Sequence, residues 1–340
     1  MYEIRKIIDN EEFRELKDSW NICCLNDSEC SPFQFFEWQY NYYSIFGNTK
    51  ELAIYIVFDV TNSNIIAIFP FWERTIEKGK LLEFIGCRGV DYLMPIVANE
   101  HKMLVYKLFE QYIKENDLNI YVHDVPQNHS FYDFFYILSA SNEITTPCGI
   151  LNLNDIRKYK EFEYDKRFLN KHNKAIHISI YLDKVIPTVL LERHIEEYIN
   201  IAENKYKHDD AKKFQQFLTI YLNEINTKKD VLYADLQNDK ELMYSIVGIK
   251  CRKTIFLLNF VFNFKYKKFA PGKMLLNELI YFASENGYDK IDFSRGADIY
   301  KTKLRCSFIN NMSFIISNDN DIKKNVTQLN EGIGFFPSCK

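Results

Sequence analysis

The sequence predicts a mixed α/β (α+β) protein of two similar halves, each a mainly antiparallel sheet flanked by helices. Apolar residues alternate in short segments typical of strands and recur at helical spacing between those segments. The same order of elements, β-α-α-β-β-β-α-β, occurs twice along the chain, which indicates duplication of a whole domain. A chain of 340 residues with 47% hydrophobic content is also long enough to form two cores.

The first half spans residues 1–155. Its opening helix is indicated by Phe13, Leu16 and Trp20, which recur at helical spacing. Short polar turns separate three later strands, so we expect an antiparallel meander. The expected elements are strand Tyr2–Ile8, a helix from Asn10, a helix at about Gln34–Phe46, strands Glu51–Asp59, Ile65–Thr75 and Leu81–Ile85, a helix at about Glu100–Glu115 and strand Leu118–His123.

The second half, residues 156–340, repeats that order. The best linker signals between the halves are Thr145–Gly149 and the polar run Asn152–Lys160. The polar end of the chain, Asn318–Lys340, is expected to be the flank of a late strand followed by a tail. The expected elements are strand Ile176–Leu182, helices at about Thr188–Lys207 and Ala211–Ile225, strands Val231–Leu236, Tyr244–Cys251 and Thr254–Phe262, helix Lys273–Asn286 and strand Lys290–Phe293.

Composition excludes several classes of protein. The net charge is only −3, so the overall charge does not attract nucleic acid. No apolar segment approaches the ~20 residues of a membrane span, and the N-terminus lacks a signal-peptide core, so we expect a cytoplasmic protein without a membrane partner. The eight cysteines show no zinc-binding spacing, so we expect reduced thiols and no metal. A catalytic role for Cys251 or Cys306 stays open, although burial is commoner for a free cysteine.

The most informative segment is a lysine-rich turn between a strand and an amphipathic helix. Pro271 and Gly272 fit the first positions of that helix, where unpaired N–H groups and the helix dipole favour an anion such as pyrophosphate. Glycine would also let a phosphate approach the backbone closely. The alternative is that Pro-Gly is simply a common start of a helix and that the lysines only protect an exposed strand edge from aggregation. The lysines of this turn are Lys265, Lys267, Lys268 and Lys273.

The run from Phe269 to Lys303 resembles the C-terminal signature of the GNAT branch that includes BioF2-like acetyltransferase domains and the peptidoglycan-bridge aminoacyl transferases. Further passages that match this branch, in the right order along the chain, are Ser31–Trp38, Phe84–Tyr92 and the basic helix Lys166–Lys171. The resemblance implies tandem GNAT domains, with acyl-coenzyme A held by the second. The turn departs from the usual glycine-rich loop by having one glycine after Ala270 and Pro271, which leaves the number of amide contacts to pyrophosphate open.

The resemblance implies that acyl-coenzyme A lies where two strands splay, with pantetheine paired to Phe256–Phe264. It places Asp298, Tyr300 and Lys301 beside the acyl group, where Tyr300 would protonate the leaving thiolate and Lys301 would contact phosphate. The alternative for these three is a solvated loop with one packed tyrosine. The predicted coenzyme-binding residues are Phe262, Phe264, Lys268, Ala270, Gly272, Lys273, Met274 and Lys301.

The first half has Gly86 and Gly89 at the comparable turn but lacks the lysine cluster. We therefore expect that its coenzyme site is degenerate and that this half binds the acceptor instead. Asp91 would accept the amine proton, and the alternative is an aspartate that caps a turn. Asp292 and Arg295 would form an ion pair or face the substrate. His172 and His177 are candidate bases without a visible partner. The predicted acceptor-binding residues are Trp72, Arg88, Tyr92, Asp292 and Arg295, with core packing the alternative for Trp72.

Three functions follow from this pattern. The first is transfer of an acyl group from acyl-coenzyme A to the amine of an amino sugar, expected to be dTDP- or UDP-linked and destined for surface polysaccharide. The second is an aminoacyl-tRNA-dependent transferase of the peptidoglycan-bridge type, whose members commonly carry a long helical hairpin not evident in this sequence. The third is a GNAT scaffold that binds a partner without catalysis.

Overall fold

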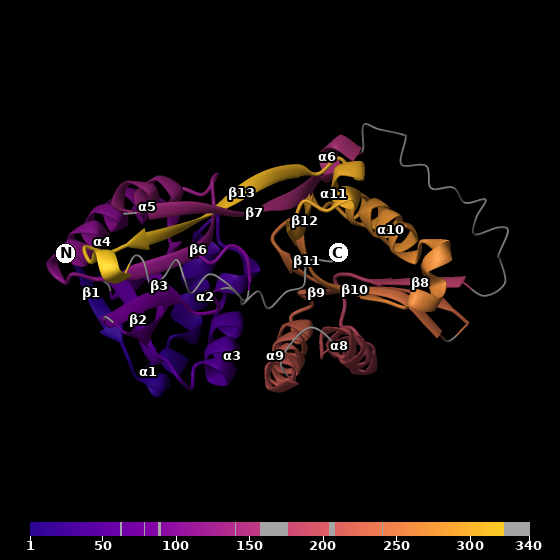
Figure 1. The fold of residues 1–340 in the computed structure, drawn as a ribbon, viewed down its shortest axis with the longest axis horizontal. Helices are drawn as coiled ribbons and strands as arrows, with labels where there is room; N and C mark the ends of the chain where they lie inside the picture. The colour runs from indigo at the N-terminus through magenta and orange to yellow at the C-terminus, as the bar shows by residue number, and fades with distance from the viewer. Residues whose placement is uncertain are drawn as a thin grey trace. The chain divides into compact units, whose positions relative to one another are not determined.

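The computed structural model describes residues 1–61, 63–77, 79–87, 90–139, 141–156, 176–203, 208–239 and 241–322. It divides into two compact units (Figure 1). Unit 1 consists of Met1–Pro147 together with the segment from Ile309, and unit 2 is Cys148–Phe308. The chain therefore crosses from one unit to the other twice, and it returns to unit 1 at Ile309.

Unit 1 is a sheet in the order β1-β2-β3-β4-β6-β13, with β5 paired to β3. Its neighbouring strands are antiparallel except β4 and β6. Helix α4 packs on β3 through stacked rings of Phe109 and Phe69, whose centroids are 3.6 Å apart. The elements are β1 Tyr2–Ile7, α1 Asn10–Glu15, α2 Lys17–Asn26, η1 Pro32–Gln34, α3 Phe36–Phe46, β2 Glu51–Asp59, β3 Asn64–Ile76, β4 Gly79–Phe84, β5 Ile96–Val97, η2 Asn99–His101, α4 Lys102–Glu115, β6 Ile120–Pro126, α5 Tyr132–Leu138 and β13 Ser307–Ile316.

Unit 2 repeats this topology in the strand order β7-β12-β11-β10-β9-β8. Again one pair of neighbours, β11 and β12, is parallel and the others are antiparallel. Figure 1 shows α10 on one face of this sheet and α8 with α9 on the other. The elements are β7 Ser141–Asn152, α6 Leu153–Ile156, β8 Ile176–Tyr181, α8 Thr188–Glu203, α9 His208–Thr227, β9 Val231–Asn238, β10 Glu241–Cys251, β11 Thr254–Phe262, η4 Phe264–Phe269, α10 Pro271–Glu285, β12 Lys290–Arg295 and α11 Ile299–Lys303.

The two faces of the unit 2 sheet differ in polarity. The face covered by α10 is apolar, with Leu232, Leu236 and Ile246 buried against Leu275 and Leu279 of the helix. Burying several such side chains contributes about 1.5–3 kcal/mol each, so this face supplies the core of the unit. The face toward α8 instead presents buried polar side chains, which are described with the site below.

The last strand of each sheet comes from a segment near the crossing between the units. In unit 1, β13 pairs with β6 from Asn311 onward, while in unit 2 β7 pairs with β12 from Cys148 onward. Pro147 lies at this crossing, directly before Cys148, where the pairing of β7 with β12 begins. Thr145–Gly149 was expected to be a linker. The compact units do meet within this segment, but it is part of strand β7 and not an irregular connection.

The predicted fold class is confirmed. Both units follow the predicted order of elements, except that in unit 1 the first helix is divided into α1 and α2 and the strand β5 is inserted before α4. The sequence analysis missed β5, α5, β7, α6, α11 and β13. The predicted division at residue 155 lies in α6, whereas the compact units meet between Pro147 and Cys148. The sequence also gave no sign that the chain returns to unit 1 at Ile309. Lys166–Lys171, His172 and residues 323–340 lie outside the described part of the chain.

Candidate functional site

The start of α10 carries the predicted phosphate-binding turn. Ala270 caps the helix in a left-handed conformation, with φ 48° and ψ 51°, although it is not glycine. The Lys273 and Met274 N–H groups donate to the Ala270 carbonyl at 3.0 and 3.3 Å, and Pro271 has no N–H. The Gly272 N–H makes no hydrogen bond within the described residues, so it is the amide of this first turn that is available to an anion.

The charge around this turn is positive and exposed. Lys267, Lys268 and Lys273 are exposed and form no ion pair in the part of the chain that the structure describes. Lys265 differs, because its ammonium lies 2.6 Å from Glu241 and this hydrogen bond raises the pKa of Lys265. Three of the four predicted lysines therefore remain uncompensated beside the positive end of the α10 dipole.

Gly272 also has a packing role. A Cβ at this position would lie 3.0 Å from two ring carbons of Tyr244 on β10, which is tighter than ordinary van der Waals contact. Glycine is therefore required both for close packing of α10 on the sheet and for an open approach to the backbone. Phe262 and Phe264 lie nearby, with ring centroids 4.9 Å apart, and Phe264 is 71% exposed.

Strand β11 provides an open backbone edge next to this turn. It pairs with β12 only from Thr254 to Phe256, opposite Lys290 to Asp292, and then continues alone to Phe262. On this side no described strand pairs with Leu257–Phe262. The two strands thus separate as the sequence analysis expected. The Leu257 carbonyl accepts from the Ser294 hydroxyl at 3.3 Å, and the rest of this edge resembles a sheet edge ready to accept an extended ligand.

A β-bulge in β11 lies where the strands separate. Val247 of β10 faces Asn259, whereas the next residue, Gly248, faces Leu257, so Leu258 is an extra residue. Such a bulge bends the strand and reverses which face later side chains occupy. Gly248 is required here, because a Cβ would lie 2.8 Å from the Phe256 carbonyl oxygen.

The turn after β12 holds the other predicted residues of unit 2. Lys301 is 1% exposed, and its ammonium donates to the carbonyls of Ser294, Arg295 and Gly296 at 3.0, 2.6 and 2.9 Å. Its three N–H groups are thereby used, which leaves none for a phosphate. The lysine stabilises a tight turn in which Ser294 and Gly296 both have positive φ.

Around this turn, Asp292 is buried and accepts a hydrogen bond from the Ser294 N–H at 2.7 Å. Asp298 precedes α11, with a carboxylate oxygen 3.5 Å from the Lys301 ammonium. Tyr300 is half-buried and packs edge-on against Phe293. Arg295 is also half-buried, so the structure brings the predicted residues Asp292, Arg295, Asp298, Tyr300 and Lys301 into one turn.

Two of the predicted residues of unit 1 lie in a buried loop. Asp91 and Tyr92 are 5% and 8% exposed, and Tyr92 has φ 64°, a strained value for a bulky residue. The Ser31 hydroxyl donates to the Tyr92 carbonyl at 3.1 Å, so two passages named by the family resemblance are in contact. Trp72 is 2% exposed on β3, with the Lys50 ammonium 3.5 Å from its ring centroid. Arg88 lies outside the described residues.

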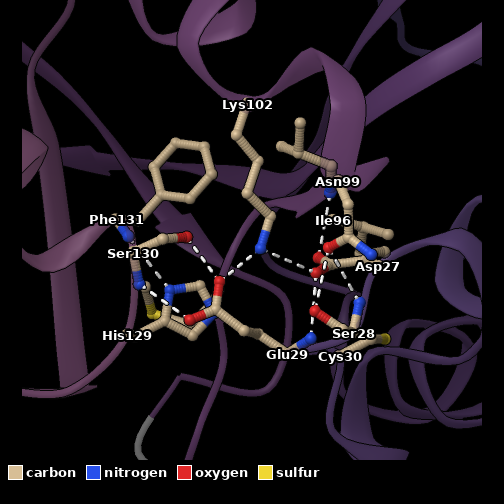
Figure 2. Close-up of polar contacts among 12 residues, drawn as sticks. Asp27, Ser28, Glu29, Cys30, Ile96, Asn99, Lys102, His129, Ser130 and Phe131 are labelled. Carbon is tan, nitrogen blue, oxygen red and sulfur yellow. Dashed lines mark hydrogen bonds and ion pairs between the residues drawn. The ribbon is translucent and has the colours of Figure 1, made fainter.

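The start of α4 in unit 1 corresponds in topology to the start of α10, but its chemistry differs. Figure 2 shows the Lys102 ammonium between the carboxylates of Asp27 and Glu29. Asp27 is 1% exposed and also accepts from the Val97 N–H at 3.1 Å. The Ser130 N–H and hydroxyl both donate to Glu29. Two carboxylates therefore occupy the region where unit 2 presents free lysines.

A buried polar network beneath α8 was missed by the sequence analysis. His194 is fully buried, with Nδ1 2.7 Å from the Ser245 hydroxyl and Nε2 2.6 Å from the Asn259 amide oxygen. Burial lowers the pKa of His194 to about 4, so the ring is neutral at pH 7. The Asn259 Nδ2 group is buried and has no hydrogen-bond partner among the described residues.

A second part of this network neighbours the first on the same face. Arg193 donates to Asp235 at 3.0 Å and to the Tyr233 hydroxyl at 3.1 Å, and the Tyr233 hydroxyl also donates to Asp235. Ser245 lies opposite Asp235 in the ladder, so the polar groups form a band across β9, β10 and β11. Single polar residues within strands gave no signal in the sequence; only their alternation with apolar neighbours would have placed them on one face.

Two other kinds of chemistry find little support in the described residues. Burial raises the pKa of the Cys306 thiol to about 11, which disfavours a thiolate there at neutral pH. No group of three or more His, Cys, Asp or Glu residues in the described part of the chain is arranged to hold a metal ion. Among the helices of that part, none has both the length and the apolarity of a membrane span.

Residues 188–302 match the sequence profile of the acetyltransferase (GNAT) domain family. This range begins at α8 and ends in α11, so it includes the α10 turn, the free edge of β11 and the polar band. No curated protein matches the chain by sequence. The match defines the second unit as an acyltransferase domain.

Solved structures resemble the chain over nearly its whole length. FemX has a TM-score of 0.61 at 9% identity, with 97% of this chain and 100% of FemX covered. A C-terminal domain (DUF2156) named for lysylphosphatidylglycerol synthetase, from Agrobacterium fabrum, has a TM-score of 0.57 at 10% identity, covering 94% of this chain and 96% of its own. L-PGS from Bacillus licheniformis has a TM-score of 0.56 at 11% identity, covering 96% and 98%.

Residues 188–302 thus belong to the acetyltransferase (GNAT) domain family, and the fold of the chain is shared with FemX, the Agrobacterium fabrum domain and L-PGS. The predicted family and the predicted enzyme class, an N-acyltransferase of the GNAT type, are therefore confirmed. The identities of donor and acceptor are not given by a shared fold and are taken up next.

Proposed function

We propose that the protein transfers an acyl group from acyl-coenzyme A to the amine of an amino sugar, with a dTDP- or UDP-linked amino sugar as the acceptor. The choice of acyl-coenzyme A as donor rests on three features at one end of unit 2. Among the described residues, Gly272 has a free N–H, three lysines form no ion pair, and one edge of β11 is unpaired. A diphosphate fits the first two features. An extended chain of amides such as pantetheine fits the third.

In this proposal the pyrophosphate binds at the start of α10. Ala270, Gly272, Lys273 and Met274 provide the helix start, and Lys268 provides a further cation. Because Pro271 has no N–H and Lys273 and Met274 donate to the Ala270 carbonyl, the backbone offers few free amides. The exposed lysines would then carry a larger share of the binding free energy than in a glycine-rich loop. Phe262 and Phe264 would line the path of the pantetheine.

The reaction balances without a further reactant. The unprotonated amine attacks the thioester carbonyl carbon, the C–N bond forms, and the C=O electron pair moves to oxygen. Collapse of this intermediate breaks the C–S bond, and the amine proton is passed on while the thiolate gains one, giving an amide and free coenzyme A. Tyr300 is proposed to protonate the thiolate. Asp298, Asp292 and Arg295 are proposed to line the acyl group with it.

The acceptor remains the less supported part of the proposal. Asp91 and Tyr92 stay candidates for holding the amine, with Asp91 as proton acceptor, and Trp72 and Arg88 as neighbours on the acceptor side. Lys301, predicted to touch phosphate, fits better as the residue that holds the turn of Asp292–Asp298, since its ammonium already donates to three carbonyls. A cytoplasmic location is part of the proposal, because acyl-coenzyme A and activated sugars occur there together.

A second candidate is aminoacyl transfer from tRNA, and the fold likeness to FemX over 97% of the chain favours it. The lysines at α10 would then contact an RNA phosphate. We place this second because a free helix start and an open strand edge together suit one extended ligand that carries a diphosphate.

One experiment separates the candidates. Purified protein is mixed with acetyl-coenzyme A, propionyl-coenzyme A or a longer acyl-coenzyme A and with each of a panel of dTDP- and UDP-linked amino sugars, and thiol release is followed. We expect rapid release with at least one pair. Absence of release from every pair, together with absence of coenzyme A binding by calorimetry, would exclude the proposal. Activity with charged tRNA that is lost on RNase treatment would establish the second candidate.

A further inference from the structure

The buried amide of Asn259 has unused donor capacity at a place that matters for the reaction. Its side chain is 3% exposed, its oxygen is bonded to His194, and its Nδ2 group has no partner among the described residues. Buried polar groups are normally paired, so an unpaired amide marks a place where a ligand would complete the bonding.

The position of Asn259 in the sheet connects it to the open edge. It lies directly after the bulge residue Leu258, within the stretch of β11 from which β12 has separated. A ligand that pairs with this edge as an added strand would lie about 4.8 Å from β11, and directly opposite groups would be about 5 Å from the Asn259 Cβ. An asparagine side chain spans that gap with one hydrogen bond.

The neighbours of Asn259 fix its orientation. Because an amide oxygen can only accept, its contact with Nε2 places the single N–H of the neutral His194 ring on Nε2, and Nδ1 is then left to accept from the Ser245 hydroxyl. The amide oxygen is thereby held toward α8 and the NH₂ group is directed away from the ring. A neutral histidine suits this role, because it adds no charge to a buried site.

We propose that Asn259 is a catalytic residue whose Nδ2 donates to the thioester carbonyl oxygen and stabilises the oxyanion that forms there, with His194 and Ser245 as positioning residues. This inference rests on the proposed function, because it requires acyl-coenzyme A along the free edge of β11. A fixed donor directed at a developing oxyanion contributes about a hundredfold to a thousandfold in kcat.

The test uses two substitutions and a matched control. Asn259→Asp replaces the donor with an oxygen at the same size, and Asn259→Ser keeps a group that accepts from His194 while removing the amide. Asn226→Asp is the control, since Asn226 is equally buried in unit 2 but has both ends of its amide bonded to Ile186, at 2.9 Å each. Thermal unfolding establishes that each variant is folded.

The readout is the infrared band of the thioester carbonyl in bound ¹³C-acetyl-coenzyme A, since a hydrogen bond to the carbonyl lowers its frequency. We expect a lower frequency in the native protein and in Asn226→Asp than in Asn259→Ser, with coenzyme affinity within threefold. His194→Gln should move the band toward that of Asn259→Ser. With the acceptor that gives the highest rate in the panel above, kcat should fall about a hundredfold in both Asn259 variants while KM changes little.

The same band in the native protein and in folded Asn259→Ser would overturn the inference, as would an unchanged kcat. These outcomes differ from failure of the proposed function, in which the native protein would not bind acetyl-coenzyme A and no bound band would be seen. If Asn259→Asp does not fold, Asn259→Ser carries the test alone.

Discussion

In unit 2 the chain passes from β11 into α10 through a short turn of exposed lysines, whereas in unit 1 it passes from β4 into α4 through residues 85–101 and a small extra strand. In unit 1, β4 ends at Phe84 and the short β5 takes over as the partner of β3, whereas in unit 2 β11 itself continues along β10 to Phe262. At the helix start, unit 2 presents cations without an ion pair among the described residues, and unit 1 holds Lys102 between the buried Asp27 and the half-buried Glu29. One topology thus presents free positive charge in one copy and, in the other, an internal brace made of Lys102, Asp27 and Glu29.

The difference teaches which parts of the duplicated domain a ligand depends on. Both units have a parallel pair of strands, and the second strand of the pair also has an antiparallel partner from near the crossing. The proposed coenzyme site needs two further features. One is a strand that continues beyond its paired neighbour, and the other is a helix start whose lysines are not neutralised by carboxylates. Carboxylates at the start of α4 would repel a diphosphate, so we expect coenzyme A to bind unit 2 alone.

The largest expected effect breaks the brace in unit 1. Lys102→Met leaves Asp27 and Glu29 close together without their cation, and Asp27 is almost completely buried. Loss of one partner from a buried ionic cluster costs about 3–5 kcal/mol in the free energy of unfolding. Urea unfolding measures the loss, and calorimetry should show unchanged affinity for coenzyme A.

Lys80→Met is the matched control in the same unit. Lys80 also bridges two carboxylates, at 2.8 Å to Glu51 and 2.5 Å to Glu73, but it is 55% exposed. Solvent screening makes such a pair weak, so the control should lose far less stability. Equal losses in the two variants would contradict the idea that unit 1 depends on a buried brace.

The next largest effect concerns the affinity of unit 2 for coenzyme A. Replacing both Lys268 and Lys273 with alanine removes two exposed cations from the α10 turn, and we expect coenzyme A affinity to fall about 100-fold, at about 1.4 kcal/mol for each contact. Stability should change little, because neither lysine forms an ion pair within the described residues. Calorimetry at low and high salt measures the affinity.

Lys212 and Lys213 on α9 provide the control for that pair. They are exposed, and their replacement with alanine changes the net charge by the same amount without touching the turn. If this control weakened the binding of coenzyme A as much as the Lys268 and Lys273 variant does, the loss would come from the net charge of the protein. The placement of the pyrophosphate at α10 would then be wrong.

The sequence predicted features that depend on neighbours along the chain. Strand and helix bounds followed from spacing, and the α10 turn followed from Pro271, Gly272 and the lysines around them. Features that depend on distant pairing were missed: β7 contains Pro147 and Gly149, which are typical of turns, and it becomes a strand because strands far away in the sequence, such as β12, lie beside it. His194 was missed for the same reason, since Ser245 and Asn259 are 51 and 65 residues away.

The smallest expected effect concerns Ala270, whose left-handed backbone is the place where the α10 turn departs from a glycine-rich loop. An alanine in this conformation costs roughly 1–2 kcal/mol, and glycine removes that cost while adding freedom to the unfolded chain. Ala270→Gly should therefore raise the free energy of unfolding by up to about 1 kcal/mol and leave coenzyme A affinity within threefold, because the backbone shape is already the one that glycine favours. Thermal unfolding and calorimetry on the same samples measure both. A loss of stability would show that the Ala270 methyl group makes packing contacts worth more than the strain, and that the turn of unit 2 is braced by side chains as the start of α4 is in unit 1.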